Sequence, residues 1–260
     1  MSKTRQYAVY EKLGSRRYAV LTLGHDYPAG HVVRPHFHDR DQLVYASSGV
    51  MTVTTADGAW IVPPDRAVWI PAAIAHTIQM SGGVSMRTLY LLPKLAKALP
   101  RRCCVVNVPP LLKELILHAC ALGKLQQSNR HHAHLIAVIL DQLATIQTVP
   151  LQLANPVDAR ALRVARALLS ESGDRLPLAA VCRQAGASKR TIERLFQKET
   201  GMPLGRWRQQ LSLMRGMRLL AEGAKVTTAA LDAGYSTPSA FIAAFKKILG
   251  VPPKFYFQRR

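Results

Sequence analysis

Hydrophobic and polar positions along this chain follow two different periods, and the period changes near residue 100. Between residues 7 and 92, short runs rich in β-branched and aromatic side chains are separated by turn residues such as Asp57-Gly58 and Pro63-Pro64. Residues 18–23 and 67–70 are two of these runs. Many short strands at such a spacing are typical of closed all-β folds, so the pattern predicts a small barrel or jelly roll.

Beyond residue 100 apolar side chains recur at helical spacing, which predicts two consecutive helices over residues 111–125 and 131–146. The repeating apolar residues are Leu111, Leu115, Leu122 and Leu125 in the first helix and Leu135, Ile139 and Leu143 in the second. Such helices can form an antiparallel pair that packs on the barrel or on a second copy of the chain, so we expect them to support a dimer. Residues 149–157 hold two prolines and no clear period, which predicts a linker.

The strongest pattern follows this linker and describes two helices joined by a tight turn. Gly186 can adopt the positive φ that ends a short helix, and Ser188 can cap the helix that comes next. Ile192, Leu195 and Phe196 then fall on one face of that helix, which leaves a basic polar face on the other side. A short helix, a glycine turn and a second helix with a basic face is the arrangement that reads the major groove of DNA.

The same order of residues recurs 48 positions later, with Gly234 in place of Gly186 and Ser236 in place of Ser188. Ser236 or Thr237 can cap the second of these later helices, and the apolar face behind that cap contains Phe241, Phe245 and Leu249. Residues 204–221 form one amphipathic helix between the two units, about 27 Å long at ~1.5 Å per residue. That length is comparable with the ~34 Å between successive major-groove faces, so one rod can carry two reading helices.

The charge of the chain agrees with a nucleic-acid partner. It holds 35 Lys and Arg against 15 Asp and Glu, and residues 156–260 alone hold 19 against 7. Residues 1–14 contain no apolar signal region, and no run of 18 apolar residues occurs. We therefore expect a cytoplasmic protein with no membrane partner, in which the four cysteines stay reduced because they lack CxxC spacing.

The C-terminal residues resemble a known family. The run from Ala185 to Phe196, followed by Gly201 and Pro203, closely resembles the first helix-turn-helix of AraC/XylS regulators. The second unit is similar to theirs at Gly234-Tyr235-Ser236, Ser239-Ala240-Phe241, Phe245-Lys246-Lys247, Gly250, Pro253 and Tyr256, and departs at Pro252 and Phe257. The resemblance implies a dimeric transcription regulator that binds promoter DNA and activates or represses a neighbouring gene.

The two reading helices differ in chemistry. The predicted DNA-contacting residues are Ser188, Lys189, Arg190, Thr191, Glu193, Arg194, Ser236, Thr237, Ser239 and Lys246. The first helix supplies long charged side chains that can reach base edges and phosphates, whereas the second supplies mostly short ones. We expect the first unit to discriminate between bases and the second to position the protein.

The N-terminal residues resemble the cupin motifs. Gly30, His36-Phe37-His38, Gln42 and Gly49 are similar to the first motif, and Pro71, Ala73 and His76 to the second. Strand alternation puts His36 and His38 on one face, and the resemblance implies that His76 converges on them. Gln42 stands where an acid is usual, yet three imidazoles and an amide could hold divalent Zn, Ni, Cu or Fe. In the alternative interpretation these side chains hydrogen-bond inside the barrel and line an effector pocket, and no cofactor is required.

The predicted fold class is therefore an N-terminal all-β cupin (jelly-roll) barrel with flanking helices, followed by an all-α double helix-turn-helix. The expected boundaries are 1–100 for the barrel, 101–148 for the helical pair, 149–157 for the linker and 158–260 for the DNA-binding domain, with helix-turn-helix units near 176–197 and 224–247.

Three functions compete. The first is an effector-responsive regulator without enzymatic activity, whose partners are double-stranded promoter DNA, a small molecule or metal, RNA polymerase and a second copy of the chain. The second is a metal-dependent cupin enzyme with a DNA-binding tail, which Gln42 disfavours because the missing carboxylate is the obvious general base. The third is a non-specific architectural DNA-binding protein, which the polar first reading helix disfavours.

Overall fold

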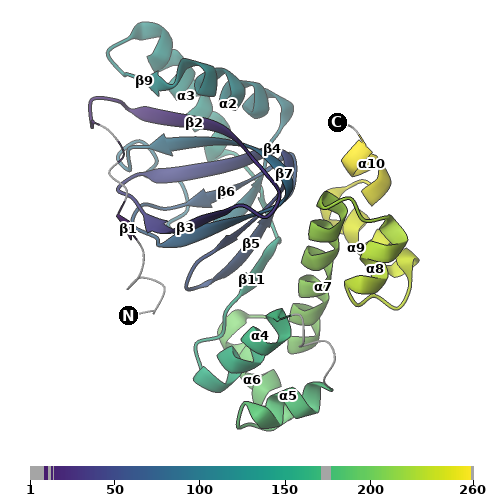
Figure 1. Ribbon diagram of the computed structural model, residues 1–260. Coiled ribbons are helices and arrows are strands. Elements are labelled where there is room, and N and C mark those ends of the chain that lie inside the picture. The colour runs from purple at the N-terminus through teal and green to yellow at the C-terminus, as the bar shows by residue number, and fades with distance from the viewer. Residues whose placement is uncertain (1–8, 11–12, 14, 171–176, 259–260) are drawn as a thin grey trace.

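The computed structural model describes residues 9–10, 13, 15–170 and 177–258, and a strand-rich half precedes a helical half (Figure 1). These halves are the expected all-β barrel and all-α region, so the predicted fold class is confirmed. No helix within the described ranges is both long enough and apolar enough to cross a membrane.

One sheet of eleven strands forms the wall of the barrel. Its longest strands, β4 (Asp41–Thr54) and β7 (His76–Leu91), pair antiparallel along most of their length. The other strands are β1 (Val9–Tyr10), β2 (Val20–Tyr27), β3 (Val32–Phe37), β5 (Gly58–Val62), β6 (Arg66–Ile70), β8 (Cys104–Asn107), β9 (Lys124–Leu125), β10 (Thr148–Val149) and β11 (Gln152–Ala154).

Strand β4 is buried on both faces at its start, because two hydrophobic clusters use its alternate residues. Leu43 and Tyr45 pack in a cluster with the two helices that follow the barrel. Val44 and Ala46 belong to the other cluster, which continues into the C-terminal helices. The barrel is therefore held between two helical layers.

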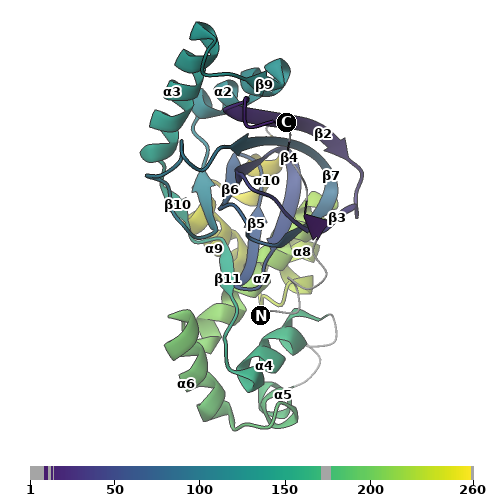
Figure 2. The same ribbon diagram turned by 90° about the vertical axis from the view of Figure 1, so that its left-hand side faces the viewer.

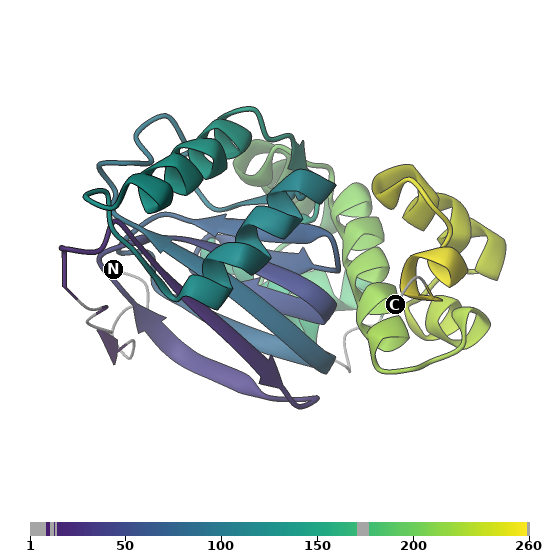
Figure 3. The ribbon, with the colours of Figure 1, turned by 90° about the horizontal axis from the view of Figure 1, so that it is seen from above.

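The first helical layer consists of α2 (Pro110–Leu122) and α3 (Arg130–Ala144), which lie across the outside of the barrel (Figure 3). Its core-facing residues are Leu112, Ile116, Ala119, Ile136, Ile139 and Leu143. Of the leucines that marked the first helix in the sequence, Leu125 is buried, whereas Leu111 and Leu122 are 54 % and 44 % exposed. The helix is apolar on more than one side, so only part of its apolar surface lies against the barrel.

Four of the nine residues expected to form the linker, residue 149 and residues 152–154, belong to the sheet. Strand β10 pairs with β8, and β11 pairs with β5 through Leu153 and Ala59. Leu151 and Leu153 are buried, so this segment has the alternation of a strand, which the neighbouring prolines obscured. Only the few residues after Ala154 remain as a connection between the two halves.

The helical half contains the two expected units and the rod between them. Its helices are α4 (Ala159–Leu169), α5 (Leu178–Gln184), α6 (Lys189–Thr200), α7 (Leu204–Ala221), α8 (Val226–Asp232), α9 (Pro238–Leu249) and α10 (Pro253–Gln258). Helix α7 stands between the barrel and the pair α8–α9, and β11 runs from the barrel toward α4 (Figures 1 and 2). The predicted rod, α7, is therefore also the helix that packs against the barrel.

Contacts from one side of α7 attach the rod to the barrel. The indole nitrogen of Trp207 donates to the carbonyl of Ala154 at 2.9 Å, and the Gln210 amide donates to the carbonyl of Gln152 at 2.8 Å. Further along the helix, Arg218 Nε lies 3.3 Å from the Ser81 hydroxyl. In the last helix, the Tyr256 hydroxyl donates to the carbonyl of Pro64. The two halves consequently share one hydrophobic cluster and a set of polar contacts.

Candidate functional site

The first reading helix, α6, begins as its sequence predicts. Gly186 has a φ of +77°, and the Ser188 hydroxyl accepts a hydrogen bond from the Thr191 amide at 3.1 Å. The apolar face of Ile192, Leu195 and Phe196 is buried. The predicted reading residues that precede and alternate with these apolar ones are therefore turned outward.

The outward face of α6 carries charge that is free to meet DNA. Lys189, Arg190, Glu193 and Arg194 are all exposed. Lys189 and Glu193 form an i,i+4 ion pair at 3.6 Å, whereas neither arginine has an ion-pair partner within the described part of the chain. The two guanidinium groups are thus the side chains of α6 best able to make bidentate contacts with guanine or phosphate.

The second reading helix, α9, offers fewer long side chains among its predicted DNA contacts. Of the two expected caps the structure uses Thr237, whose hydroxyl accepts from the Ala240 amide at 3.2 Å. Ser236, Ser239 and Lys246 are exposed, but the two serines are short. Since its hydroxyl caps the helix, Thr237 is the least available of the predicted contacts on this unit.

A groove of about 700 Å³ runs between α7 and α9, and no sequence pattern predicts it. Ser236 and Ala240 of the second unit line one side, and Arg206 and Gln209 of α7 line the other. The helices approach closely nearby, because a Cβ on Gly216 would lie 2.5 Å from the Phe241 ring. Arg206 is exposed at this groove and becomes a candidate phosphate contact that the sequence patterns did not single out.

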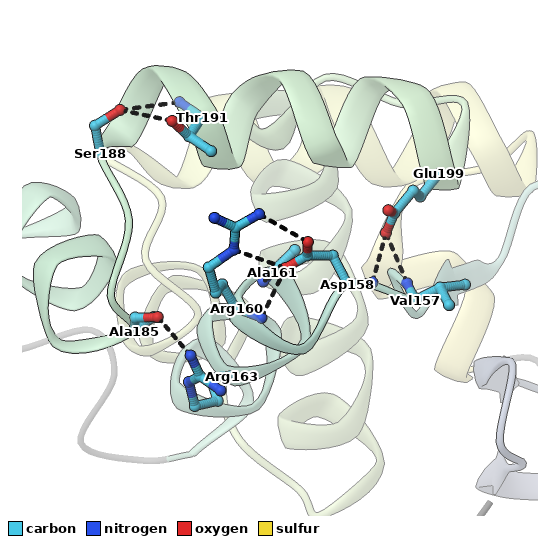
Figure 4. A network of polar contacts seen from close by, with 9 residues as sticks. All are labelled: Val157, Asp158, Arg160, Ala161, Arg163, Ala185, Ser188, Thr191 and Glu199. Atoms are coloured by element: carbon cyan, nitrogen blue, oxygen red, sulfur yellow. Dashed lines mark hydrogen bonds and ion pairs between the residues drawn. The ribbon is translucent and has the colours of Figure 1, made fainter. Parts of the chain in front are cut away.

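Polar contacts from α4 support the first unit from behind (Figure 4). Asp158 caps α4 by accepting from the Arg160 amide at 2.8 Å, and the Arg160 guanidinium beside it holds the pKa of this carboxyl far below its usual range. Arg163 donates to the carbonyl of Ala185 at 2.8 Å, next to the turn before α6. Glu199 accepts from the amides of Val157 and Asp158 at 2.7 and 2.9 Å. These bonds fix both ends of α6 relative to α4.

The predicted histidines come together inside the strand-rich half. His36 lies in β3 opposite His76 at the start of β7, and His38 follows β3 directly. All three are buried, and each offers a ring nitrogen such that these atoms lie within 4.8 Å of one another. The strand alternation and the register of β3 with β7 thus produce the convergence that the cupin resemblance implied.

The hydrogen bonds of these rings fix their tautomers. In each histidine Nδ1 faces a backbone carbonyl: that of Arg34 for His36 at 2.8 Å, that of Arg40 for His38 at 2.7 Å, and that of Ile74 for His76 at 2.9 Å. A carbonyl can only accept, so each Nδ1 carries the proton and a neutral ring keeps its lone pair on Nε2. Metal-ligating histidines are oriented in this way.

The Nε2 atoms are placed as ligands. Burial, and then the neighbouring His36, lower the pKa of His76 to about 3, so its ring is neutral. His76 Nε2 is a buried atom with no hydrogen-bond partner among the described residues. An orphaned lone pair in a protein interior is costly, and a bound cation would satisfy it.

Gln42 completes the centre. Its Oε1 lies 3.1 Å from His38 Nε2, while its amide nitrogen donates to the Thr88 hydroxyl at 3.2 Å. When Nδ1 of a neutral His38 ring is protonated toward Arg40, the Nε2 of His38 and the Oε1 of Gln42 are both acceptors. A metal ion coordinated by both would remove this conflict, so three imidazole nitrogens and one amide oxygen fit a divalent transition metal.

Comparisons with known proteins agree with these two halves. An AraC-like ligand binding domain model matches residues 18–169, and a helix-turn-helix domain model matches residues 181–259. The HTH-type transcriptional regulator NimR of Escherichia coli K12 is 34% identical over 227 residues, 86% of this chain and 82% of NimR. The HTH-type transcriptional regulator RipA of Corynebacterium glutamicum is 30% identical over 98 residues, 38% of this chain and 30% of RipA.

Among solved structures, ToxT from Vibrio cholerae aligns over 92% of this chain and 98% of its own, at 10% identity and a TM-score of 0.38, a likeness too weak to carry an argument. The assignment depends instead on the ligand-binding model, which spans more than half of the chain, and on the similarity to NimR over most of its length. The chain belongs to the AraC/XylS family of transcription regulators and combines a cupin-like ligand-binding domain with a helix-turn-helix DNA-binding domain.

Proposed function

We propose that this regulator recognises one promoter sequence chiefly through α6 and that its effector is a divalent transition metal bound by His36, His38, Gln42 and His76. The observation that carries the proposal is the orientation of the three rings, whose protonated Nδ1 atoms face carbonyls while their Nε2 atoms converge. A bound ion would supply a charge that joins β3 to β7 at the centre. It would thereby favour one arrangement of the barrel over another.

We assign a binding role to the histidine centre and no catalytic role. Gln42 provides a neutral amide where a carboxylate could act as a general base. The neighbouring carboxylate of Asp41 instead accepts a hydrogen bond from the Ala72 amide at 2.8 Å and holds the loop before His76. The chemistry of the residues thus favours binding of a ligand over its conversion.

Base discrimination is assigned to Arg190 and Arg194. Both project from the exposed face of α6, and a bidentate arginine contact with guanine contributes about 1–3 kcal/mol of discrimination. Lys246 at the end of α9 and Arg206 in the groove would contact phosphates, which position the protein without reading sequence. The remaining predicted contacts lie in the same two helix-turn-helix units. They are Ser188, Lys189, Thr191, Glu193, Ser236, Thr237 and Ser239.

A second copy of the chain and RNA polymerase complete the proposed partners. Leu111, Leu122 and Val138 remain exposed on α2 and α3 after the opposite faces have packed on the barrel, which supports association of two copies through this layer. Leu122→Glu in the full chain should then shift sedimentation toward the monomer. An unchanged dimer would place the contact elsewhere.

The experiment that tests the proposed function is a selection of sheared genomic DNA with purified protein at physiological salt. It is run with and without Zn²⁺, beside the Arg190→Ala/Arg194→Ala variant. Enrichment of one promoter by the wild type alone, altered by Zn²⁺, is the expected result. Equal recovery of all fragments in every sample would contradict sequence reading, and enrichment that ignores Zn²⁺ would contradict the metal as effector.

A further inference from the structure

The connection between the two halves is short and hydrogen-bonded at both ends. At the barrel end, the amide of Asn155 donates to the carbonyl of Asp57 at 2.8 Å, and its side-chain amide donates to the carbonyl of Ala56 at 3.1 Å. At the other end, Val157 and Asp158 donate their amides to Glu199. Four residues thus join the β4–β5 turn of the barrel to helix α6.

Glu199 lies in the last turn of the reading helix itself. Its carboxylate accepts two charge-assisted hydrogen bonds, at 2.7 and 2.9 Å, from the start of α4 (Figure 4). Arg190 and Arg194 stand on the same rigid helix, so a shift at Glu199 moves both guanidinium groups relative to DNA. A displacement of about 1 Å is enough to misplace such contacts.

The barrel end of this connection lies close to the histidine centre. Thr77, the residue after His76, pairs with Thr54 in the β4–β7 ladder. Thr54 in turn pairs with Ala59 and enters the turn that contains Ala56 and Asp57. One strand pair and one turn therefore separate His76 from the carbonyls that hold Asn155.

A second contact runs beside the first. The Trp207 indole donates to the carbonyl of Ala154 at 2.9 Å, and its ring packs edge-on against Phe196 with centroids 5.4 Å apart. Phe196 belongs to the buried face of α6. The end of β11 is thus attached both to the side and to the end of the reading helix, which makes it a stiff junction instead of a flexible tether.

We propose that Asn155 and Glu199 are positioning residues that couple the histidine centre to the reading helix α6. An ion held by His76 would shift the β4–β5 turn, the turn would move Asn155, and Glu199 would pass the displacement to α6. This inference rests on the proposed function, because it takes the histidine centre as the effector site. A passive tether would behave differently: loss of Glu199 would then lower stability and leave the response of DNA binding to metal unchanged.

The test measures DNA affinity by fluorescence anisotropy, with a labelled duplex of the selected promoter fragment, in the presence and absence of Zn²⁺. Glu199→Ala removes the acceptor, Glu199→Gln keeps an acceptor oxygen, and Asn155→Ala weakens the barrel end. Glu222→Ala is the matched control, since it removes one exposed carboxylate from the same half of the chain. Zn²⁺ affinity of every protein is measured separately by competition with a chromophoric chelator.

The wild type and Glu222→Ala are expected to change their DNA affinity at least fivefold when Zn²⁺ binds, within the usual range of coupling between sites. Glu199→Ala and Asn155→Ala are expected to bind Zn²⁺ as tightly as the wild type and to change less than twofold. Glu199→Gln should recover most of the response. A full response in Glu199→Ala with normal Zn²⁺ binding would overturn the coupling.

If the wild type fails to bind Zn²⁺, the proposal that the effector is a metal is refuted, but the proposed coupling between the turn and α6 is not. A second measurement then tests the coupling. Coupling is reciprocal, so DNA on α6 should slow amide hydrogen exchange in the turn at residues 54–58. The expected protection is present in the wild type and lost in Glu199→Ala. Absence of DNA-induced protection in the wild type would overturn the proposed connection.

Discussion

The interface between barrel and rod makes a sharp prediction at Gly82. This residue of β7 has a φ of +71°, and a Cβ built on it would collide with the carbonyl oxygen of Ala221 at the end of α7. Gly83, its neighbour, has an ordinary φ, and a Cβ there would meet no atom within 4 Å. The two glycines are adjacent in the same strand, so they form a matched pair for testing whether the halves are docked.

Gly82→Ala is expected to destabilise the protein by about 2–5 kcal/mol. Roughly 1–2 kcal/mol comes from the left-handed backbone, and roughly 1–3 kcal/mol from an overlap that only a shift of α7 relieves. The same shift separates Arg218 from Ser81. Gly83→Ala is expected to change stability by less than about 1 kcal/mol, since the added methyl enters open space.

Thermal unfolding followed by circular dichroism measures the difference. At roughly 2–4 °C per kcal/mol for a protein of this size, Gly82→Ala should lower Tm by roughly 4–20 °C, or split the transition as the helical half unfolds by itself. Small-angle X-ray scattering should show a larger radius of gyration for that variant. Identical Tm and scattering for both variants would refute the docked arrangement.

Three further outcomes follow from the site. Arg190→Ala and Arg194→Ala should each weaken binding to the selected promoter by about 1–3 kcal/mol and relax its sequence preference, whereas Ser239→Ala should matter less; a larger effect of Ser239→Ala would reverse the assignment of the reading helix. Ser188→Ala should cost about 1 kcal/mol of stability through the lost cap of α6, and an unchanged denaturant midpoint would contradict that role. Zn²⁺ at about 100 times its Kd should stabilise the wild type by ~2.7 kcal/mol and leave His76→Ala unchanged; equal stabilisation of both would place the metal elsewhere.

The helix-turn-helix units could be predicted from the sequence because their determinants are local. Gly186 and Gly234 need positive φ, Ser188 caps the next turn, and the apolar residues of α6 and α9 recur within one helix. Each feature lies within a few residues of the one it acts on. Local rules therefore identified these helices and the buried face of each reading helix.

The histidine centre was predictable only in part. Alternation along β3 places His36 and His38 on one face, but the approach of His76 depends on the register of β3 against β7. That register includes an irregularity between Val33 and His36, which no local rule supplies. The resemblance to cupins identified His76 as the third histidine of this centre, which periodicity could not.

The interface between the halves could not be predicted, because it consists of contacts between residues far apart in the chain. Asn155 bonds to Ala56, Glu199 to Val157, and Tyr256 to Pro64. Tyr256 belongs to the second helix-turn-helix pattern and Pro64 to a predicted turn, but neither pattern indicates that the two residues meet. The segment expected to be a linker is part of this interface. Its burial could not be predicted either, because it depends on β5 and α7 lying beside it.

Binding of the purified protein to its selected promoter fragment, compared with a scrambled duplex of the same length at about 0.15 M salt, tests the central claim most directly. A sequence-reading regulator should prefer the selected duplex by at least ~10³-fold once its effector is present, and the Arg190→Ala/Arg194→Ala variant should lose most of that preference. Equal affinity for the two duplexes, with the same steep fall as salt rises, would contradict the account and indicate binding through charge alone.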